Sequence, residues 1–163
     1  MIDTNSTSRG IIRPTVAADL PALKTIISVN QMFPAEMLDN MIGSFLAGEA
    51  AEERWLTVDD GGPIAVAYHV PERMTDGTYN LLLIAVHPDR HGQGLGAALM
   101  AHVEADLAAR SARVLLVETS GLPEFERTRR FYRHIGYEEE ARIREFYAAG
   151  EDKVVFRKAL GPP

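Results

Sequence analysis

The chain has 163 residues, of which 46% are hydrophobic and 25% are charged, an ordinary composition for one globular domain. Its formal net charge of −6 argues against a nucleic-acid partner, because binding to a phosphate backbone needs a basic surface. The sequence contains no cysteine, which excludes disulfides, thiolate metal sites and a covalent cysteinyl intermediate. We expect no metal.

The polar N-terminus lacks the apolar core of a signal peptide, and no apolar run approaches the ~20 residues that span a bilayer. We therefore expect a cytoplasmic protein without a membrane partner. Residues 1–9 are expected to be a flexible tail. Residues 10–160 are expected to form a single domain, since no repeat or long linker divides them. The sequence leaves open whether the protein forms a homodimer.

The first predicted elements are one strand and two helices. The strand covers residues 10–16, Asp19 is expected to cap the amides of the first helix, and the second helix begins after Pro34. Apolar residues recur at helical spacing in both helices: Leu20, Leu23, Ile26 and Ile27 in the first, and Met37, Leu38, Met41, Ile42 and Phe45 in the second.

Strands dominate the rest of the chain. Residues 54–59 and 63–70 form a predicted hairpin, and the apolar runs 81–86 and 114–117 are expected to be central strands covered on both faces. Between these runs a helix carries Leu95, Leu99, Val103 and Leu107 on one face. A helix after Pro123 and strands near 137–147 and 152–160 complete the order β-α-α-β-β-β-α-β-α-β-β. This order predicts a mixed α/β (α+β) fold with a mostly antiparallel sheet of about seven strands and helices on both faces.

A glycine-rich loop lies between the strand at 81–86 and the following helix. Gly92, Gly94 and Gly96 remove Cβ atoms that would keep an anion from the backbone, and the first amides of the helix have no partner within it. Arg90 adds a positive charge nearby. The pattern predicts a binding site for a diphosphate.

A dinucleotide-binding loop is the main alternative for this motif. Gly92, Gly94 and Ala97 fit the relaxed fingerprint G-x-G-x-x-A, with Glu118 as a distant candidate for the ribose contact. Against this alternative, residues 87–91 separate the strand from the glycines, and two helices and a hairpin precede it where further βαβ units are expected.

The run from Val86 through Pro88 to Gly92, Gly94 and Gly96 resembles motif A of the GNAT acetyltransferases, in which this loop holds the diphosphate of CoA. The resemblance implies acetyl-CoA as co-substrate and backbone pairing of the strand end with the pantetheine arm. His91 stands where the family commonly has Gln or Arg. The implied cofactor-binding residues are Ile84, Ala85, Val86, Arg90, His91, Gly92, Gln93, Gly94, Leu95, Gly96 and Ala97.

A second motif lies on the helix after Pro123. Phe125, Thr128, Tyr132 and Ile135 are spaced to share one face, and by spacing alone Tyr132 reads as a core tyrosine. The run from Phe131 through Tyr132 to Gly136 and Tyr137 resembles the GNAT motif F-Y-x-x-x-G-F/Y. The resemblance implies that Tyr132 protonates the departing CoA thiolate.

Without cysteine, the simplest chemistry is direct attack of an amine on the thioester in a ternary complex. A base must deprotonate the amine, and Glu118, at the end of a central strand, is the first candidate. An equally good interpretation of Glu118 is a solvated charge at a strand end. His134 is expected to face water, and Arg129, Arg130 and Arg133 to complement the end of their helix.

The acceptor is left open between two kinds of amine. By the resemblance, the acceptor pocket involves residues 33–45 and 144–152, and a small amine or amino acid is favoured. The ending from Phe146 to Asp152 also resembles ribosomal-protein N-terminal acetyltransferases, which makes a peptide N-terminus the alternative. A CoA-binding module without catalysis is the alternative of another class.

Overall fold

A computed structural model describes residues 10–161, and the expected flexible tail at residues 1–9 lies outside this range. The strands are β1 (Ile11–Pro14), β2 (Arg54–Asp59), β3 (Pro63–Pro71), β4 (Thr78–Val86), β5 (Val114–Ser120), β6 (Glu138–Ala148) and β7 (Glu151–Ala159). The helices are α1 (Leu20–Val29), α2 (Leu38–Leu46), α3 (Leu95–Ala109) and α4 (Glu126–His134). Short 3-10 turns precede each of them except α3, and one, η3 (Pro88–Arg90), follows β4. The predicted element order is confirmed.

Within the described range the seven strands form a sheet in the order β1-β2-β3-β4-β5-β7-β6. The β4–β5 pair is parallel, with a register from Thr78↔Val114 to Leu81↔Val117, whereas β1–β2, β5–β7 and β6–β7 are antiparallel. By contacts the chain divides into two compact units, residues 1–68 with 83–102 and residues 69–82 with 103–163. β3, β4 and α3 contribute residues to both units.

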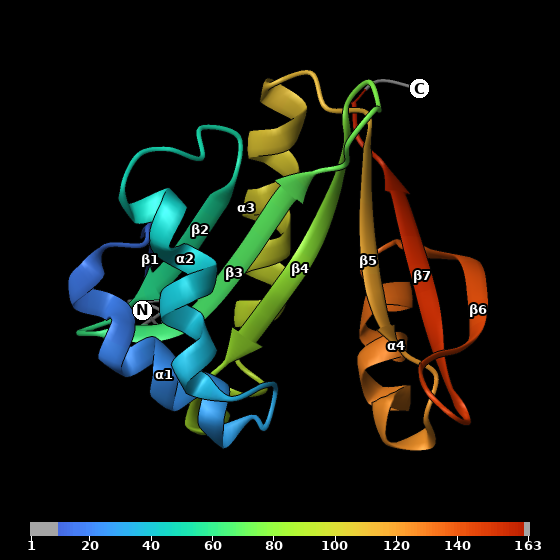
Figure 1. Ribbon diagram of the computed structural model, residues 1–163, viewed down its shortest axis with the longest axis horizontal. Coiled ribbons are helices and arrows are strands. Elements are labelled where there is room, and N and C mark those ends of the chain that lie inside the picture. Colours follow the sequence, from blue (N-terminus) through green and yellow to red (C-terminus); the bar gives the residue numbers. More distant parts are fainter. Residues whose placement is uncertain (1–9, 162–163) are drawn as a thin grey trace, which may run out of the picture. The chain divides into compact units, whose positions relative to one another are not determined.

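Two layers of helices cover the strands of the first unit. In Figure 1, α1 and α2 lie in front of these strands and α3 lies behind them. The buried side chains come from all these elements, and Trp55 stacks on Tyr68 with ring centroids 4.0 Å apart. The core of this unit includes Leu23, Ile26, Ile27, Leu38, Ile42, Trp55, Val58, Val66, Leu95, Leu99 and Met100. The apolar faces predicted for the first three helices are largely the faces that pack.

Asp19 does not cap α1 as predicted. Its carboxylate accepts two hydrogen bonds of 2.8 Å from the Arg13 guanidinium, and one of 2.9 Å from the amide of Val16. A 3-10 turn at 17–19 precedes α1, so Asp19 bonds backward to the start of that turn. The hydrogen bonds from Arg13, more than any other interaction, lower the pKa of this buried carboxyl.

The two apolar central strands are less covered than their sequences indicate. In β4, Leu81, Leu83 and Ala85 are buried, but Leu82 is 51% exposed, and Ile84 is half-buried. In β5, Leu115 and Val117 are buried while their neighbours are half-buried. The prediction of cover on both faces is therefore wrong for Leu82, because a continuous apolar run does not reveal whether anything packs on its second face.

In the second unit, aromatic rings pack α4 against β7. The Tyr132 ring lies 5.6 Å from that of Phe156 and 5.9 Å from that of Tyr137. Beside them, the Lys158 ammonium contacts both carboxylate oxygens of Glu104, at 3.0 and 3.1 Å. These contacts hold α4, the end of β7 and the second half of α3 together. Within residues 10–161, no helix is long and apolar enough to cross a membrane.

Candidate active site

The glycine loop has its backbone exposed at the start of α3. Gly92 and Gly94 have φ angles of +75° and +76°, which favour glycine, and a Cβ built on either would meet no atom within 4 Å. The helix's hydrogen bonds begin with Ala98 donating to the Gly94 carbonyl at 3.0 Å. The amides of Leu95, Gly96 and Ala97 precede that bond, so the helix offers them no carbonyl. Open space beside such amides suits an anionic group.

The side chains of Arg90 and His91, in the glycine loop, form hydrogen bonds or ion pairs with other residues of the protein. The Arg90 guanidinium lies 2.5 Å from an Asp60 carboxylate oxygen and donates to Gln93 Oε1 at 3.0 Å. His91 Nε2 lies 2.8 Å from the Val86 carbonyl oxygen. The charge of Arg90 is therefore partly compensated, which leaves the backbone amides as the loop's main candidates for binding an anion.

The end of β4 holds the other residues predicted to contact CoA. Ala85 is buried, while Ile84 and Val86 are half-buried. The Val86 carbonyl also accepts a hydrogen bond of 3.0 Å from Asn30 Nδ2. Asn30 follows α1 and was not singled out from the sequence. Together with His91 it fixes the carbonyl at the end of β4, just before the glycine loop.

Tyr132 lies on the packed face of α4 and is 4% exposed. Its ring contacts those of Phe131, Tyr137 and Phe156, with centroid distances of 5.3 to 5.9 Å. Burial raises the pKa of the Tyr132 phenol well above its usual value. The phenol therefore keeps its proton throughout the neutral range, and a protonated phenol is a hydrogen-bond and proton donor.

The prediction of which α4 residues face the core is wrong in part. Phe125 is 37% exposed and Thr128 is exposed, whereas Arg129, expected only to complement the end of its helix, is 6% exposed. Arg129 donates to the carbonyls of Ser120 and Leu122 at 2.6 and 2.9 Å. A 3-10 turn at 123–125 starts the helix later than a regular pattern assumes. Arg129 thereby ties α4 to the end of β5, while His134 is exposed as predicted.

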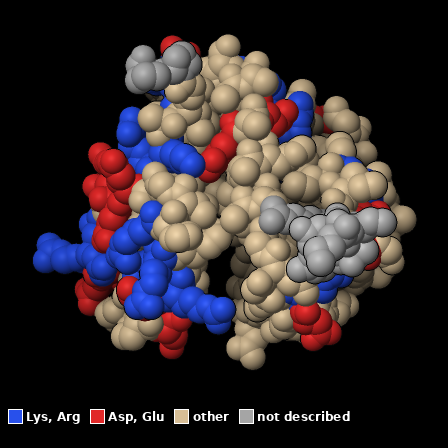
Figure 2. All heavy atoms as spheres, turned by 180° about the vertical axis from the view of Figure 1, so that it is seen from behind, with Lys and Arg blue, Asp and Glu red and all other residues tan. Residues whose placement is uncertain are grey.

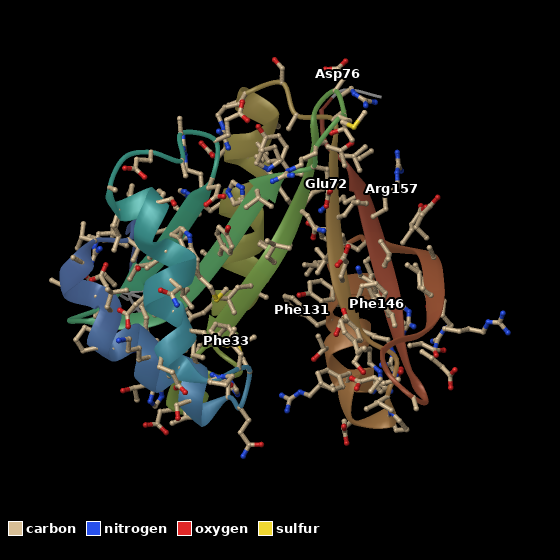
Figure 3. The ribbon with its side chains drawn as sticks, viewed as in Figure 1. Phe33, Glu72, Asp76, Phe131, Phe146 and Arg157 are labelled. Carbon is tan, nitrogen blue, oxygen red and sulfur yellow. The ribbon has the colours of Figure 1, made fainter. Side chains whose placement is uncertain are left out.

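Glu118 lies inside β5 in a network of polar side chains. It accepts a hydrogen bond of 3.0 Å from Asn80 Nδ2, and its other oxygen lies 2.7 Å from the Lys153 ammonium. Asn80, which is 3% exposed, also donates to Glu72 at 2.9 Å. Lys153 lies 3.9 Å from the centre of the Phe146 ring. Glu72 and Phe146 are labelled in Figure 3. Glu118 is therefore a positioned carboxylate and not a solvated strand end.

Asn80 and Lys153 were missed in the sequence. Asn80 is the one amide within the run Asn80–Val86, and this was the available signal, because a polar residue in a buried strand needs a partner. Lys153 gave no such signal, since its pairing with Glu118 depends on the β5–β7 register. Among residues 10–161, no group of three or more His, Asp or Glu side chains is arranged to hold a metal ion.

A hollow lies on the β6–β7 hairpin and overlaps residues 144–152, part of the region predicted to contact the acceptor. Its lining carries both signs of charge: Arg142, Ile143, Arg144, Glu145, Gly150 and Asp152. Arg142 donates to Asp152 at 3.0 Å, and Asp152 accepts the Glu145 amide at 2.9 Å. The bond from the Glu145 amide, followed by that from Arg142, lowers the pKa of Asp152.

Comparisons with known proteins identify this architecture. A family model for the acetyltransferase (GNAT) domain matches residues 50–139. The structure of a GNAT-family protein from Desulfovibrio desulfuricans is 32% identical, with a TM-score of 0.85, and the match covers 91% of this chain and 98% of that chain. No curated protein matches the sequence.

Two more distant structures share the fold. The ribosomal-protein-S18-alanine N-acetyltransferase of Escherichia coli is 23% identical, with a TM-score of 0.74, and the match covers 94% of this chain and 95% of that chain. The phosphinothricin acetyltransferase of Sinorhizobium meliloti, in complex with AcCoA, is 19% identical, with a TM-score of 0.74 and coverage of 94% and 89%.

The fold and these matches define the protein as an acyltransferase. The chain belongs to the GNAT acetyltransferase family. The dinucleotide-binding alternative is therefore set aside.

Proposed function

We propose that this enzyme transfers the acetyl group of acetyl-CoA to the primary amine of a small molecule or amino acid, with residues 10–160 as the catalytic domain. The observation that carries this proposal is the glycine loop. Gly92 and Gly94 have positive φ angles and open space at their Cβ positions, and the first amides of α3 follow them directly, an arrangement that suits a diphosphate. The S. meliloti relative, whose structure contains AcCoA, supports the choice of donor.

In the proposed reaction the neutral amine attacks the thioester carbonyl carbon. Before this attack Glu118 takes one proton from the incoming ammonium. A C–N bond then forms, the nitrogen loses its extra proton to solvent, and the tetrahedral intermediate collapses with cleavage of the C–S bond. The Tyr132 phenol gives its proton to the departing thiolate, so that CoA leaves as the free thiol. The amides of the glycine loop bind the diphosphate and orient the donor.

The assignment of Glu118 as the base rests on its polar network. Asn80 and Lys153 bond to different oxygens of this carboxylate and restrict its rotation. A restricted carboxylate keeps one geometry toward an incoming ammonium group, which makes proton transfer efficient. Asn80 and Lys153 are therefore positioning residues for Glu118.

A screen of acceptors tests the acceptor class. Small amines, free amino acids and short peptides with free N-termini are each incubated with acetyl-CoA, and the released thiol is measured. We expect turnover with small amines or amino acids. Turnover with peptides alone would replace this acceptor with a protein N-terminus; the E. coli relative is named for an alanine of ribosomal protein S18. CoA binding without turnover of any amine would favour the binding module.

Ligand-induced stabilisation tests the donor. We expect CoA and acetyl-CoA to raise the free energy of unfolding by about 2.7 kcal/mol at a hundredfold excess over Kd, because they bind only the folded protein. NAD should give no such effect. Thermal melts and calorimetric titrations measure both ligands, and NAD binding in the absence of CoA binding would contradict the proposal.

Substitution of Gly94 by Val tests the loop directly. We expect Gly94→Val to weaken CoA binding at least about tenfold, because the side chain would enter the open space and disturb a backbone with φ of +76°. Gly48 is a matched control: it has φ of +74° and equally open surroundings, but lies outside the loop. Gly48→Val should cost similar stability and leave the calorimetric Kd unchanged. Equal affinities in the two variants would mean that the loop is only a turn.

The order of the chemical steps gives a further prediction. Because the chain has no cysteine to carry the acetyl group, we expect sequential kinetics with intersecting double-reciprocal plots. Parallel lines, or an acetylated enzyme detected by mass spectrometry during turnover, would show a covalent intermediate and contradict direct attack.

A further inference from the structure

The strands of the second unit carry helices on one face only. Phe156 of β7 points toward α4, since its ring lies 5.6 Å from that of Tyr132. Neighbouring residues of a strand point to opposite faces, so Val155 and its cross-strand partner Glu118 point to the other face. In Figure 1, α4 lies behind β5 and β7, and within residues 10–161 no helix of this unit lies in front of them. The proposed base therefore stands on an uncovered face.

This uncovered face carries apolar surface around the carboxylate. Leu82 of β4 is 51% exposed, and Leu116 and Val155 are half-buried beside Glu118. The other face of this unit is charged, and Figure 2 shows Lys and Arg side chains gathered where α4 lies. Its exposed arginines are Arg127, Arg130 and Arg133. Exposed apolar surface beside a few polar groups is typical of a small-molecule site.

β6 is irregular near its end. Its pairing with β7 shifts register between Ile143 and Ala148, and Glu145 within that stretch has φ of +53°, which residues other than glycine rarely adopt. Asp152 Oδ1 accepts a hydrogen bond of 2.9 Å from the Glu145 amide, and Glu145 Oε1 accepts one of 3.1 Å from the Gly150 amide. Such an irregularity redirects the side chains of its strand and is common beside active sites. These two hydrogen bonds fix it here.

Two aromatic rings of this irregular stretch lie beside the base. In a regular strand Phe146 and Tyr147 would point to opposite faces, but their ring centroids are 5.1 Å apart in edge contact. The Phe146 ring lies 3.9 Å from the Lys153 ammonium, which is 2.7 Å from Glu118. Burial, followed by the charges of Glu118 and Glu151, raises the pKa of the Tyr147 phenol. Both rings therefore lie on the Glu118 side, and they are 51% and 45% exposed.

We propose, on the basis of the acetyl transfer inferred above, that Phe146 and Tyr147 select the acceptor, a primary amine that carries an aromatic group near its nitrogen. The acceptor's ring packs on these two exposed rings while its amine reaches Glu118. Aromatic rings in offset or edge contact attract each other beyond the area that they bury. Lys153 already compensates the charge of Glu118, so a second ammonium group on the acceptor would be repelled near this carboxylate.

Two amines that differ by a phenyl ring test this selection. 2-Phenylethylamine and ethylamine are compared as acceptors at saturating acetyl-CoA, by release of the CoA thiol. We expect wild type to use 2-phenylethylamine with a kcat/KM at least about tenfold higher, an effect of the size that apolar contacts give in a pocket. Phe146→Ala and Tyr147→Ala should each lower kcat/KM for 2-phenylethylamine at least about fivefold and leave that for ethylamine within about twofold.

The controls separate ring contact from general effects on the protein. Phe146→Tyr keeps a ring at this position and should retain the preference. Met74→Ala removes another exposed apolar side chain of the same unit, in the turn before β4, and should change neither amine. Both aromatic side chains are about half exposed, so the melting temperatures of the alanine variants should stay close to that of wild type.

The outcomes that contradict the selection differ from those that contradict the acetyl transfer itself. A wild type that uses ethylamine as well as 2-phenylethylamine, or alanine variants that lose activity equally with both amines, would overturn the role of the two rings. Thiol release with neither these amines nor any acceptor of the screen above would contradict the proposed function, and the aromatic acceptor with it.

Discussion

Replacement of Tyr132 by Phe is expected to lower kcat about a hundredfold. General acids contribute about 10² to 10⁴ in rate, and the lower part applies because a thiolate of pKa near 8.5 is already a fair leaving group. The ring and its contacts with Phe131, Tyr137 and Phe156 remain, so the free energy of unfolding should fall by no more than about 1.5 kcal/mol. Steady-state kinetics and chemical denaturation measure the two effects, and acetyl-CoA affinity should change little.

Tyr137 provides the matched control for this variant. It is 3% exposed, lies in the same aromatic cluster, and donates to Glu104 at 3.1 Å. Tyr137→Phe removes the same atom and a bond to a charged group, so we expect a loss of about 1.5–3 kcal/mol in stability with kcat unchanged. If Tyr132→Phe instead keeps kcat within about threefold of wild type, Tyr132 is a structural residue and the proton comes from elsewhere.

Replacement of Glu118 by Gln is expected to lower kcat/KM about a hundredfold at neutral pH. An aliphatic amine with a pKa near 10 arrives mostly as ammonium, so losing the base should slow the reaction. The deficit should shrink as pH is raised toward about 9, because more of the amine then arrives deprotonated. A pH series of kcat/KM with one good acceptor measures this. A purely structural role for Glu118 predicts lower stability with an unchanged pH profile.

Glu72 is the matched control for Glu118. Both carboxylates accept a hydrogen bond from Asn80 Nδ2, at 2.9 Å for Glu72 and 3.0 Å for Glu118. Glu72→Gln therefore perturbs the same asparagine without removing the proposed base, and we expect activity within about threefold of wild type. A collapse of activity in Glu72→Gln, with Glu118→Gln nearly active, would transfer the role of base to Glu72.

Much of the fold was predictable because it depends on local patterns. The helical spacing of Leu95, Leu99, Val103 and Leu107 predicted the buried face of α3, and all four are buried. The Gly61 and Gly62 turn predicted the β2–β3 hairpin, and both glycines have positive φ. Such signals come from backbone preferences and amphipathic faces, which need no knowledge of distant residues.

Predictions failed where a short irregular turn changed the phase of an element. The 3-10 turns at 17–19 and 123–125 precede α1 and α4, so Asp19 bonds backward to Val16 and Phe125 lies outside the regular helix. Arg129 lies inside α4 and is buried where it donates to the carbonyls of Ser120 and Leu122, which spacing could not predict. Regular spacing assumes 3.6 residues per turn from the first residue, and a tighter turn breaks this assumption.

The sequence by itself determined the order of elements, the glycine loop and the family resemblance, because each depends on residues that are close together in the chain. It also determined the absence of a cysteine nucleophile, which follows from composition. Only the tertiary structure decided that Glu118 is held by Asn80 and Lys153, which lie 38 and 35 positions away in the chain. It also decided that Arg90 forms an ion pair with Asp60, and that β6 is exposed along its whole length. These features depend on strand order and register, which bring distant residues together only after the sheet has formed.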